Sequence, residues 1–143
     1  MSRGIRTQHL ELAAKWDAAG NHDEAINELA RGTRAGDVEC TALLGLRLLT
    51  GDRSPLLPVE GLRFLSEACE KGSGFAAARG AAIMALGVQV PQDWKRALEW
   101  LAMAAQLGHV PAQRQLLALG ADRELAARLY ASASPPTRVQ WQH

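Results

Sequence analysis

Three glycines spaced 36 residues apart, Gly36, Gly72 and Gly108, constrain the fold of this chain more than any other feature. The residues at fixed offsets from each glycine are alike: a small residue eleven positions before, a leucine seven before and a small residue four after. In the order of these offsets, the residues are Ala25, Gly61 and Ala97, then Leu29, Leu65 and Leu101, then Cys40, Ala76 and Ala112. Agreement at this many offsets identifies an internal repeat, and such a period is typical of stacked helical hairpins.

Helix-forming residues dominate the chain, and segments rich in β-branched or aromatic residues are missing, so we expect an all-α protein. The repeat predicts an α-α superhelix, or solenoid, of about three to four antiparallel helix hairpins. The expected helices span residues 7–19 and 23–35, 38–50 and 58–71, 74–86 and 93–107, and finally 110–119 and 122–133. Residues 1–133 would form the repeat domain, and residues 134–143 a linker-like tail.

Local signals agree with these boundaries. Gly36, Gly72 and Gly108 follow apolar-periodic segments, so we expect each to cap a helix in the left-handed conformation. Asp37 comes directly after the first of these glycines and is suited to capping the next helix. Small residues at fixed positions allow two helices to approach closely, while the repeated leucines fill the space between hairpins.

Composition and charge exclude several classes of function. The chain has 143 residues and a net charge of +1, without the basic face that is typical of nucleic-acid binders. It contains no apolar segment of roughly 18 residues and no signal sequence, so we expect a cytoplasmic protein with no membrane partner. We find no GxGxxG, GxxxxGK[ST], GxSxG or HExxH motif, and therefore predict no catalytic residues, no cofactor and no metal. Cys40 and Cys69 are expected to be small buried residues.

The third repeat carries a specific signature. In residues 93–112 the pattern is D-x-x-x-A-x-x-W-x-x-x-A-A-x-x-G-x-x-x-A, with Asp93, Ala97, Trp100, Gly108 and Ala112 among its fixed positions. This pattern resembles the Sel-one-like repeat, a relative of the tetratricopeptide repeat, and the resemblance covers residues 7–120. It implies a right-handed superhelix whose first helices line a concave groove, in a protein that acts as a scaffold or adaptor.

The resemblance also implies which side chains face that groove. Projecting the tetratricopeptide pattern onto these helices gives Glu39, Ala42, Leu46, Leu49, Phe75, Ala78, Ala82, Ala85 and Arg114. We interpret these residues as a shallow, mostly apolar groove that accepts a helix or an extended peptide of a protein partner. The alternative is that the superhelix is too short to form a groove and that these residues pack against the chain termini.

Four tryptophans stand out in a chain that is poor in other aromatic residues. Trp16 and Trp100 fall at regular packing positions, so we predict that both lie in the core. Trp94 begins a helix and is expected to cover the edge of a hairpin. Trp141 follows Pro135 in the tail, where no predicted helix can accept it.

The favoured function is a non-catalytic protein–protein interaction scaffold. The alternative is an N-terminal accessory module, for recognition or docking, of a larger bacterial enzyme such as a 2-oxoglutarate/iron-dependent prolyl-hydroxylase-type oxygenase. The linker-like tail with Trp141 motivates that alternative. A third possibility is self-association through an exposed apolar end of the solenoid.

Overall fold

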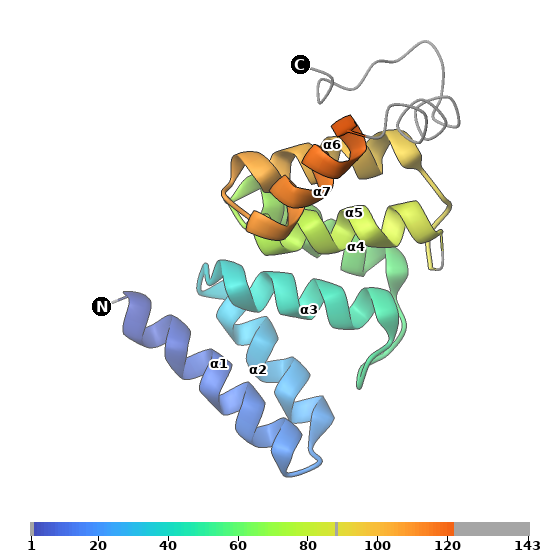
Figure 1. Ribbon diagram of the computed structural model, residues 1–143. Helices are drawn as coiled ribbons and strands as arrows, with labels where there is room; N and C mark the ends of the chain where they lie inside the picture. The colour runs from blue at the N-terminus through green and yellow to red at the C-terminus, as the bar shows by residue number, and fades with distance from the viewer. Residues whose placement is uncertain (1, 88, 122–143) are drawn as a thin grey trace. The chain divides into compact units, whose positions relative to one another are not determined.

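The computed structural model describes the backbone of residues 2–87 and 89–121 and the side chains of residues 8–87 and 89–119. Within these ranges the chain forms helices only (Figure 1). They are α1 (Ser2–Ala18), α2 (His22–Arg34), α3 (Val38–Thr50), α4 (Pro58–Glu70), α5 (Gly74–Leu86), α6 (Trp94–Gln106) and α7 (Val110–Ala121). The all-α prediction is confirmed. The expected helix at 122–133, the tail at 134–143 and Trp141 lie outside the described residues.

The helices pair as the repeat predicts. The helices α1 and α2, α3 and α4, and α5 and α6 each pack against one another as consecutive hairpins. The chain divides into two compact units, residues 1–73 with α1 to α4 and residues 74–143 with α5 to α7. Predicted and observed bounds agree for α3 and α5, whereas α1 begins at residue 2 instead of residue 7.

The predicted caps are present. Gly36, Gly72 and Gly108 have φ angles of 88°, 100° and 89°, in the left-handed region that glycine enters without steric cost. The Asp37 carboxylate accepts hydrogen bonds from the backbone N–H groups of Glu39 at 3.0 Å and Cys40 at 3.3 Å, and so caps α3. The glycines that define the repeat period therefore mark the ends of helices.

The residues that recur every 36 positions are also the residues that the helices bury. Ala25, Leu29, Leu65 and Ala112 are almost completely shielded from solvent. Between α3 and α4 the backbones approach so closely that a Cβ atom on Gly61 would lie 2.6 Å from the Gly45 carbonyl oxygen. The small residues of the repeat are therefore required by the distance between paired helices.

The prediction for the two packing tryptophans is half right. Trp100 is buried, and its ring fills the space that a side chain at Gly80 would need. Trp16 is 36% exposed, so its placement in the core is wrong. It lies near the end of α1, the outermost helix of its unit as described, where no further hairpin covers it.

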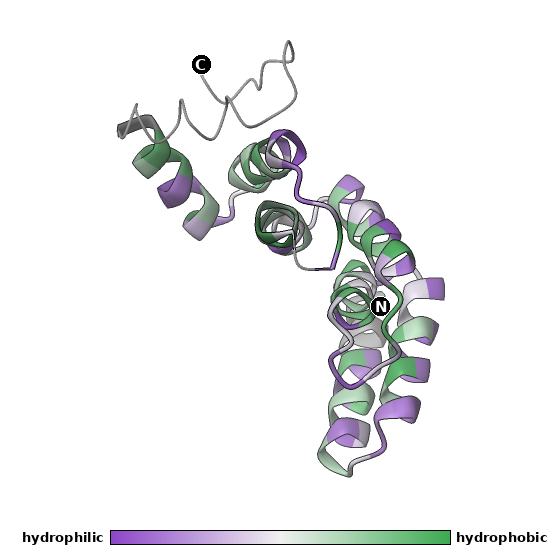
Figure 2. Cartoon of the chain, turned by 90° about the vertical axis from the view of Figure 1, so that its right-hand side faces the viewer, coloured by the Kyte–Doolittle hydropathy of each residue, from purple (hydrophilic) through white to green (hydrophobic). Residues whose placement is uncertain are grey.

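The helices α2, α4 and α6 are amphipathic, whereas α5 is apolar at every position except Arg79. Figure 2 shows how hydrophobic and hydrophilic residues are distributed along the helices. Within each unit, apolar side chains buried between the hairpin partners, and also between α2 and α3 and between α6 and α7, build the core. Among residues 2–87 and 89–121, no helix combines the length and the apolar character that a bilayer-crossing segment requires.

Candidate functional site

The structure distributes the nine predicted groove residues over both units. In the second unit, Ala78, Ala82 and Ala85 line one pocket together. Phe75 and Arg114 are exposed but do not line it. In the first unit, Leu46 lines a different pocket, Glu39 is exposed, and Ala42 and Leu49 are buried.

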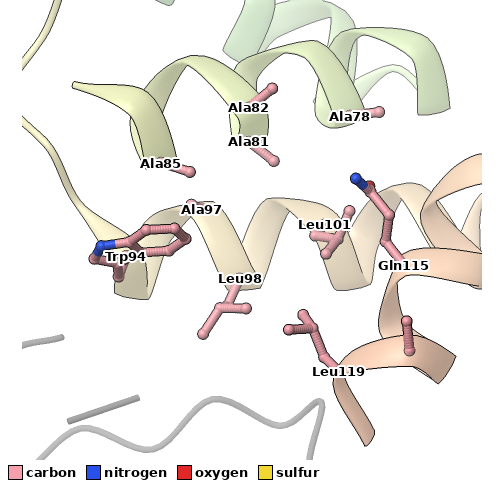
Figure 3. A pocket seen from close by; sticks show the side chains of 11 residues that line it. Ala78, Ala81, Ala82, Ala85, Trp94, Ala97, Leu98, Leu101, Gln115 and Leu119 are labelled. Carbon is pink, nitrogen blue, oxygen red and sulfur yellow. The ribbon is translucent and has the colours of Figure 1, made fainter. Parts of the chain in front are cut away.

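The pocket of the second unit lies between α5, α6 and α7 and has a volume of about 490 Å³. We call it the second-unit pocket. Figure 3 shows Ala81 and Ala85 pointing from α5 toward α6, and Leu119 pointing from α7 toward the side chains of α6. The complete lining is Ala78, Ala81, Ala82, Ala85, Trp94, Ala97, Leu98, Leu101, Gln115, Ala118 and Leu119. Because α5 contributes only methyl groups to this wall, the space beside it stays open.

The chemistry of this pocket is almost entirely apolar. Its only polar side-chain groups are the amide of Gln115 and the indole N–H of Trp94. Figure 3 shows the Gln115 side chain extending from α7 toward α5, and the Trp94 ring lying at the other end of the pocket. No lining residue is titratable, so the pocket offers no general acid, general base or charged anchor for a phosphate. It is suited to apolar side chains.

The pocket of the first unit, which we call the first-unit pocket, occupies the equivalent place in the repeat. The helix α3 contributes Leu43, Leu46 and Arg47 to its lining. Adding 72 positions, which is two repeat periods, gives residues 115, 118 and 119, and these are the residues that α7 contributes to the second-unit pocket. Its α1 residues 10, 13, 14 and 17 precede residues 78, 81, 82 and 85 of α5 by 68 positions. This offset is four residues shorter than two repeat periods. The connection between α1 and α2, residues 19–21, is also four residues shorter than the connection between α5 and α6, residues 87–93, and this accounts for the difference.

The first-unit pocket is smaller, with a volume of about 230 Å³, and charged side chains form part of its lining. The buried Arg47 guanidinium donates from Nη1 to Asp17 Oδ2 at 2.6 Å and from Nη2 to Asp17 Oδ1 at 3.0 Å. The same guanidinium also donates to the backbone carbonyls of Asp52 and Arg53, at 3.3 Å and 2.9 Å. The pair therefore joins α1, α3 and the loop that follows α3.

Hydrogen bonding from Arg47 lowers the pKa of the Asp17 carboxyl from 3.8 to about 2, against the opposing effect of burial. His22 adds a hydrogen bond to the same carboxylate at 2.8 Å. The pair was not predicted, because its two residues lie 30 positions apart and neither recurs in the repeat. In the second-unit pocket the equivalent positions are Ala85 and Leu119, which cannot form such a pair.

The remaining reactive side chains serve structural contacts. Cys40 and Cys69 are buried, as predicted, and burial together with the Asp37 carboxylate raises the pKa of the Cys40 thiol to about 12. His9 Nδ1 lies 2.6 Å from Glu28 Oε2, and this hydrogen bond lowers the pKa of Glu28. In the part of the chain that the structure describes, no three His, Cys, Asp or Glu residues are grouped to hold a metal ion.

Of the residues that line the second-unit pocket, the predicted groove includes only Ala78, Ala82 and Ala85 of α5, and not Ala81. Sequence reasoning missed the contribution of α6, where Ala97 and Leu101 were assigned to packing between hairpins, and the contribution of α7 apart from the nearby Arg114. A comparison of equivalent repeat positions could have indicated the Asp17–Arg47 pair, because these two charged residues correspond to the apolar residues Ala85 and Leu119.

Comparison with known proteins identifies the fold. No family model matches the sequence, and no curated protein matches it. Among solved structures, a Sel1 repeat protein from Oxalobacter formigenes superposes with a TM-score of 0.69 at 23% identity, over 96% of this chain and 54% of that chain. A protective antigen present in uropathogenic Escherichia coli strains, which displays an SLR fold, superposes with a TM-score of 0.71 at 19% identity, over 88% of this chain and 29% of that chain.

The chain therefore has the Sel1-like repeat fold, an all-α helical-repeat solenoid. This confirms the resemblance that the third repeat carries. The chain spans about half the length of the first of these proteins and less than a third of the second.

Proposed function

We propose that this chain is a protein-interaction scaffold and that the second-unit pocket is where it binds its partner. The observation that carries the proposal is an open space of about 490 Å³ lined by alanine and leucine side chains and by the Trp94 ring. Apolar pockets of a few hundred Å³ with one or two polar groups are typical binding sites. The absence of a titratable side chain from this lining favours binding over catalysis.

The equivalent place in the first unit supports this assignment. There the chain fills part of the space with its own Asp17–Arg47 pair, so less room remains for the side chains of a partner. Leu46, which the sequence placed in the groove, lines that narrower pocket. We therefore propose that Ala78, Ala82 and Ala85 contact the partner, and that Leu46 contributes less.

Site-specific photo-crosslinking tests the proposal in the cells that make the protein. A benzophenone side chain at the exposed position of Ala82 should form an adduct with one protein, identified by mass spectrometry. The same probe at exposed Arg34 of the first unit is the matched control. Adding Ala85→Asp to the Ala82 probe variant should abolish the adduct, because a buried carboxylate without a partner is unfavourable in an apolar contact.

The same adduct from both probe positions, or an adduct that survives Ala85→Asp with the circular dichroism unchanged, would reject this pocket as the binding site. The accessory-module alternative makes a different prediction. There the crosslinked peptide would come from a further domain of the same polypeptide, and the adduct would form within one chain.

A further inference from the structure

We propose that the partner segment is an amphipathic α-helix whose apolar side enters the second-unit pocket and whose flanking positions carry carboxylates. This inference rests on the proposed function and adds the conformation and the charge of the ligand. It follows from three properties of the pocket: its lack of hydrogen-bonding groups, its length along α5 and the charge around its rim.

The lack of hydrogen-bonding groups favours a helix over an extended peptide. The walls are faces of α5, α6 and α7, and away from the helix ends their backbone N–H and C=O groups bond within their own helices. Only Gln115 and Trp94 offer polar side-chain atoms. An extended segment buried here would leave most of its backbone groups without partners, whereas a helix satisfies its own.

The length of the pocket sets the spacing of the inserted residues. The α5 wall runs from Ala78 to Ala85, and a rise of 1.5 Å per residue makes this span about 10 Å. Apolar side chains at positions i, i+4 and i+7 of a bound helix cover the same length along one face. The recessed alanine wall leaves room for side chains of leucine size.

The charge around the pocket is positive. Three cationic residues each lie one helical turn from a lining residue: Arg79 before Ala82 on α5, Lys95 before Leu98 on α6, and Arg114 before Ala118 on α7. Within the described residues of this unit, no carboxylate forms an ion pair with any of them. The Arg79 guanidinium lies 5.8 Å from the centre of the exposed Phe75 ring.

The two carboxylates of this described unit lie elsewhere. Asp93 caps α6, where its carboxylate accepts the backbone N–H of Arg96 at 3.0 Å. Glu99 is exposed, and no lining residue lies one turn from it. A helix that enters the pocket therefore meets three positive charges at the rim, and acidic residues beside its apolar stripe complement them.

A displayed library of 14-residue helices tests the proposal and does not require the natural partner to be identified first. Leucines are fixed at positions 4, 8 and 11, and all other positions are randomised. Selection against the full chain should enrich Asp and Glu at the positions that flank the leucines. Selection against the triple variant Arg79→Glu, Lys95→Glu, Arg114→Glu should enrich Lys and Arg there instead.

The controls distinguish the effect of the rim charges from that of net charge, and test whether the ligand must be helical. A second triple variant changes the net charge by the same amount at exposed positions of the first unit: Arg34→Glu, Arg63→Glu, Lys71→Glu. It should select the same acidic helices as the unmodified chain. Selected helices should lose roughly tenfold in affinity for the rim variant, as expected for three exposed ion pairs. Proline at their central position should abolish binding.

The outcomes distinguish this inference from the function on which it rests. Helices that bind equally well to the Ala82→Asp variant would show that the pocket is not the binding site, and both proposals would fail. Binding that depends on Ala82 but shows no acidic bias, or that tolerates the central proline, would leave the proposed function standing and overturn the inference.

Discussion

At the scale of single residues, side chains at equivalent positions of the repeat distinguish the smaller first-unit pocket from the larger second-unit pocket. Asp17 and Arg47 fill part of the first-unit pocket and hold the loop carbonyls of Asp52 and Arg53. Ala85 and Leu119 leave the second-unit pocket open. Equivalent positions of the repeat therefore carry a buried ion pair in the first unit and apolar side chains in the second.

The Asp17–Arg47 pair gives a prediction for stability at acidic pH. Because the pKa of Asp17 falls from 3.8 to about 2 in the folded protein, its stabilisation is present above pH 4 and is lost as the pH falls toward 2. Asp17→Asn should lower the free energy of unfolding at pH 7 by about 1–2 kcal/mol, allowing for partial solvent screening. Urea unfolding of both proteins between pH 7 and pH 2 measures this difference, which should shrink below pH 4. A constant difference would show that Asp17 acts through packing alone.

At the scale of helices and hairpins, the repeat predicted the elements well because its fixed positions have local causes. The glycines with positive φ end helices, and the small residues fit between paired helices, so both appear in the sequence at regular intervals. Trp16 was misplaced because periodicity reports which face of a helix packs, but not whether a neighbouring helix is present to cover it.

The close approach of α3 and α4 predicts whether the substitution Gly61→Ala raises or lowers the stability of the protein. Gly→Ala in an open helix stabilises a protein by about 0.4–1 kcal/mol, because alanine has less freedom when unfolded. At Gly61 the new Cβ would lie 2.5 Å from the Leu49 backbone nitrogen, so the paired helices must separate. We expect Gly61→Ala to destabilise the protein by about 1–3 kcal/mol in urea unfolding.

Ser66→Ala is the control for this substitution, because it adds no atom to the same helix and should change stability little. A Gly61→Ala protein as stable as the original, or more stable, would mean that the two backbones are farther apart than described.

At the scale of the whole molecule, the sequence predicted the solenoid, but of the residues that line the second-unit pocket it named only three, all on α5. The α6 and α7 walls could not be predicted because their residues, such as Leu98 and Leu119, follow the same apolar pattern as the core. Whether such residues meet in a packed core or border an open space depends on the relative positions of three helices. The period in the sequence predicts which helices are neighbours, but not how far apart they lie.

Because the two pockets correspond, we predict that exchanging the side chains at their equivalent positions changes how much apolar ligand each pocket binds. Ala85→Asp with Leu119→Arg should place an ion pair across the second-unit pocket and remove its capacity to bind an apolar ligand. Asp17→Ala with Arg47→Leu should widen the first-unit pocket, because both replacements put a shorter side chain in its lining. Titration with the neutral fluorescent dye Nile red measures both effects without a contribution from the rim charges.

Relative to the unmodified chain, bound dye at saturation should fall several-fold in the first exchange variant and rise about twofold in the second, as expected from one site lost and one gained. Far-ultraviolet circular dichroism and a cooperative urea transition must match the unmodified chain, since a loosened core also binds the dye. The single variant Arg47→Lys, which keeps the charge beside Asp17, is the matched control and should leave dye binding unchanged. If the second exchange variant binds no additional dye while remaining folded, the first-unit pocket is not a narrowed copy of the second, and the repeat equivalence that supports the proposed function is lost.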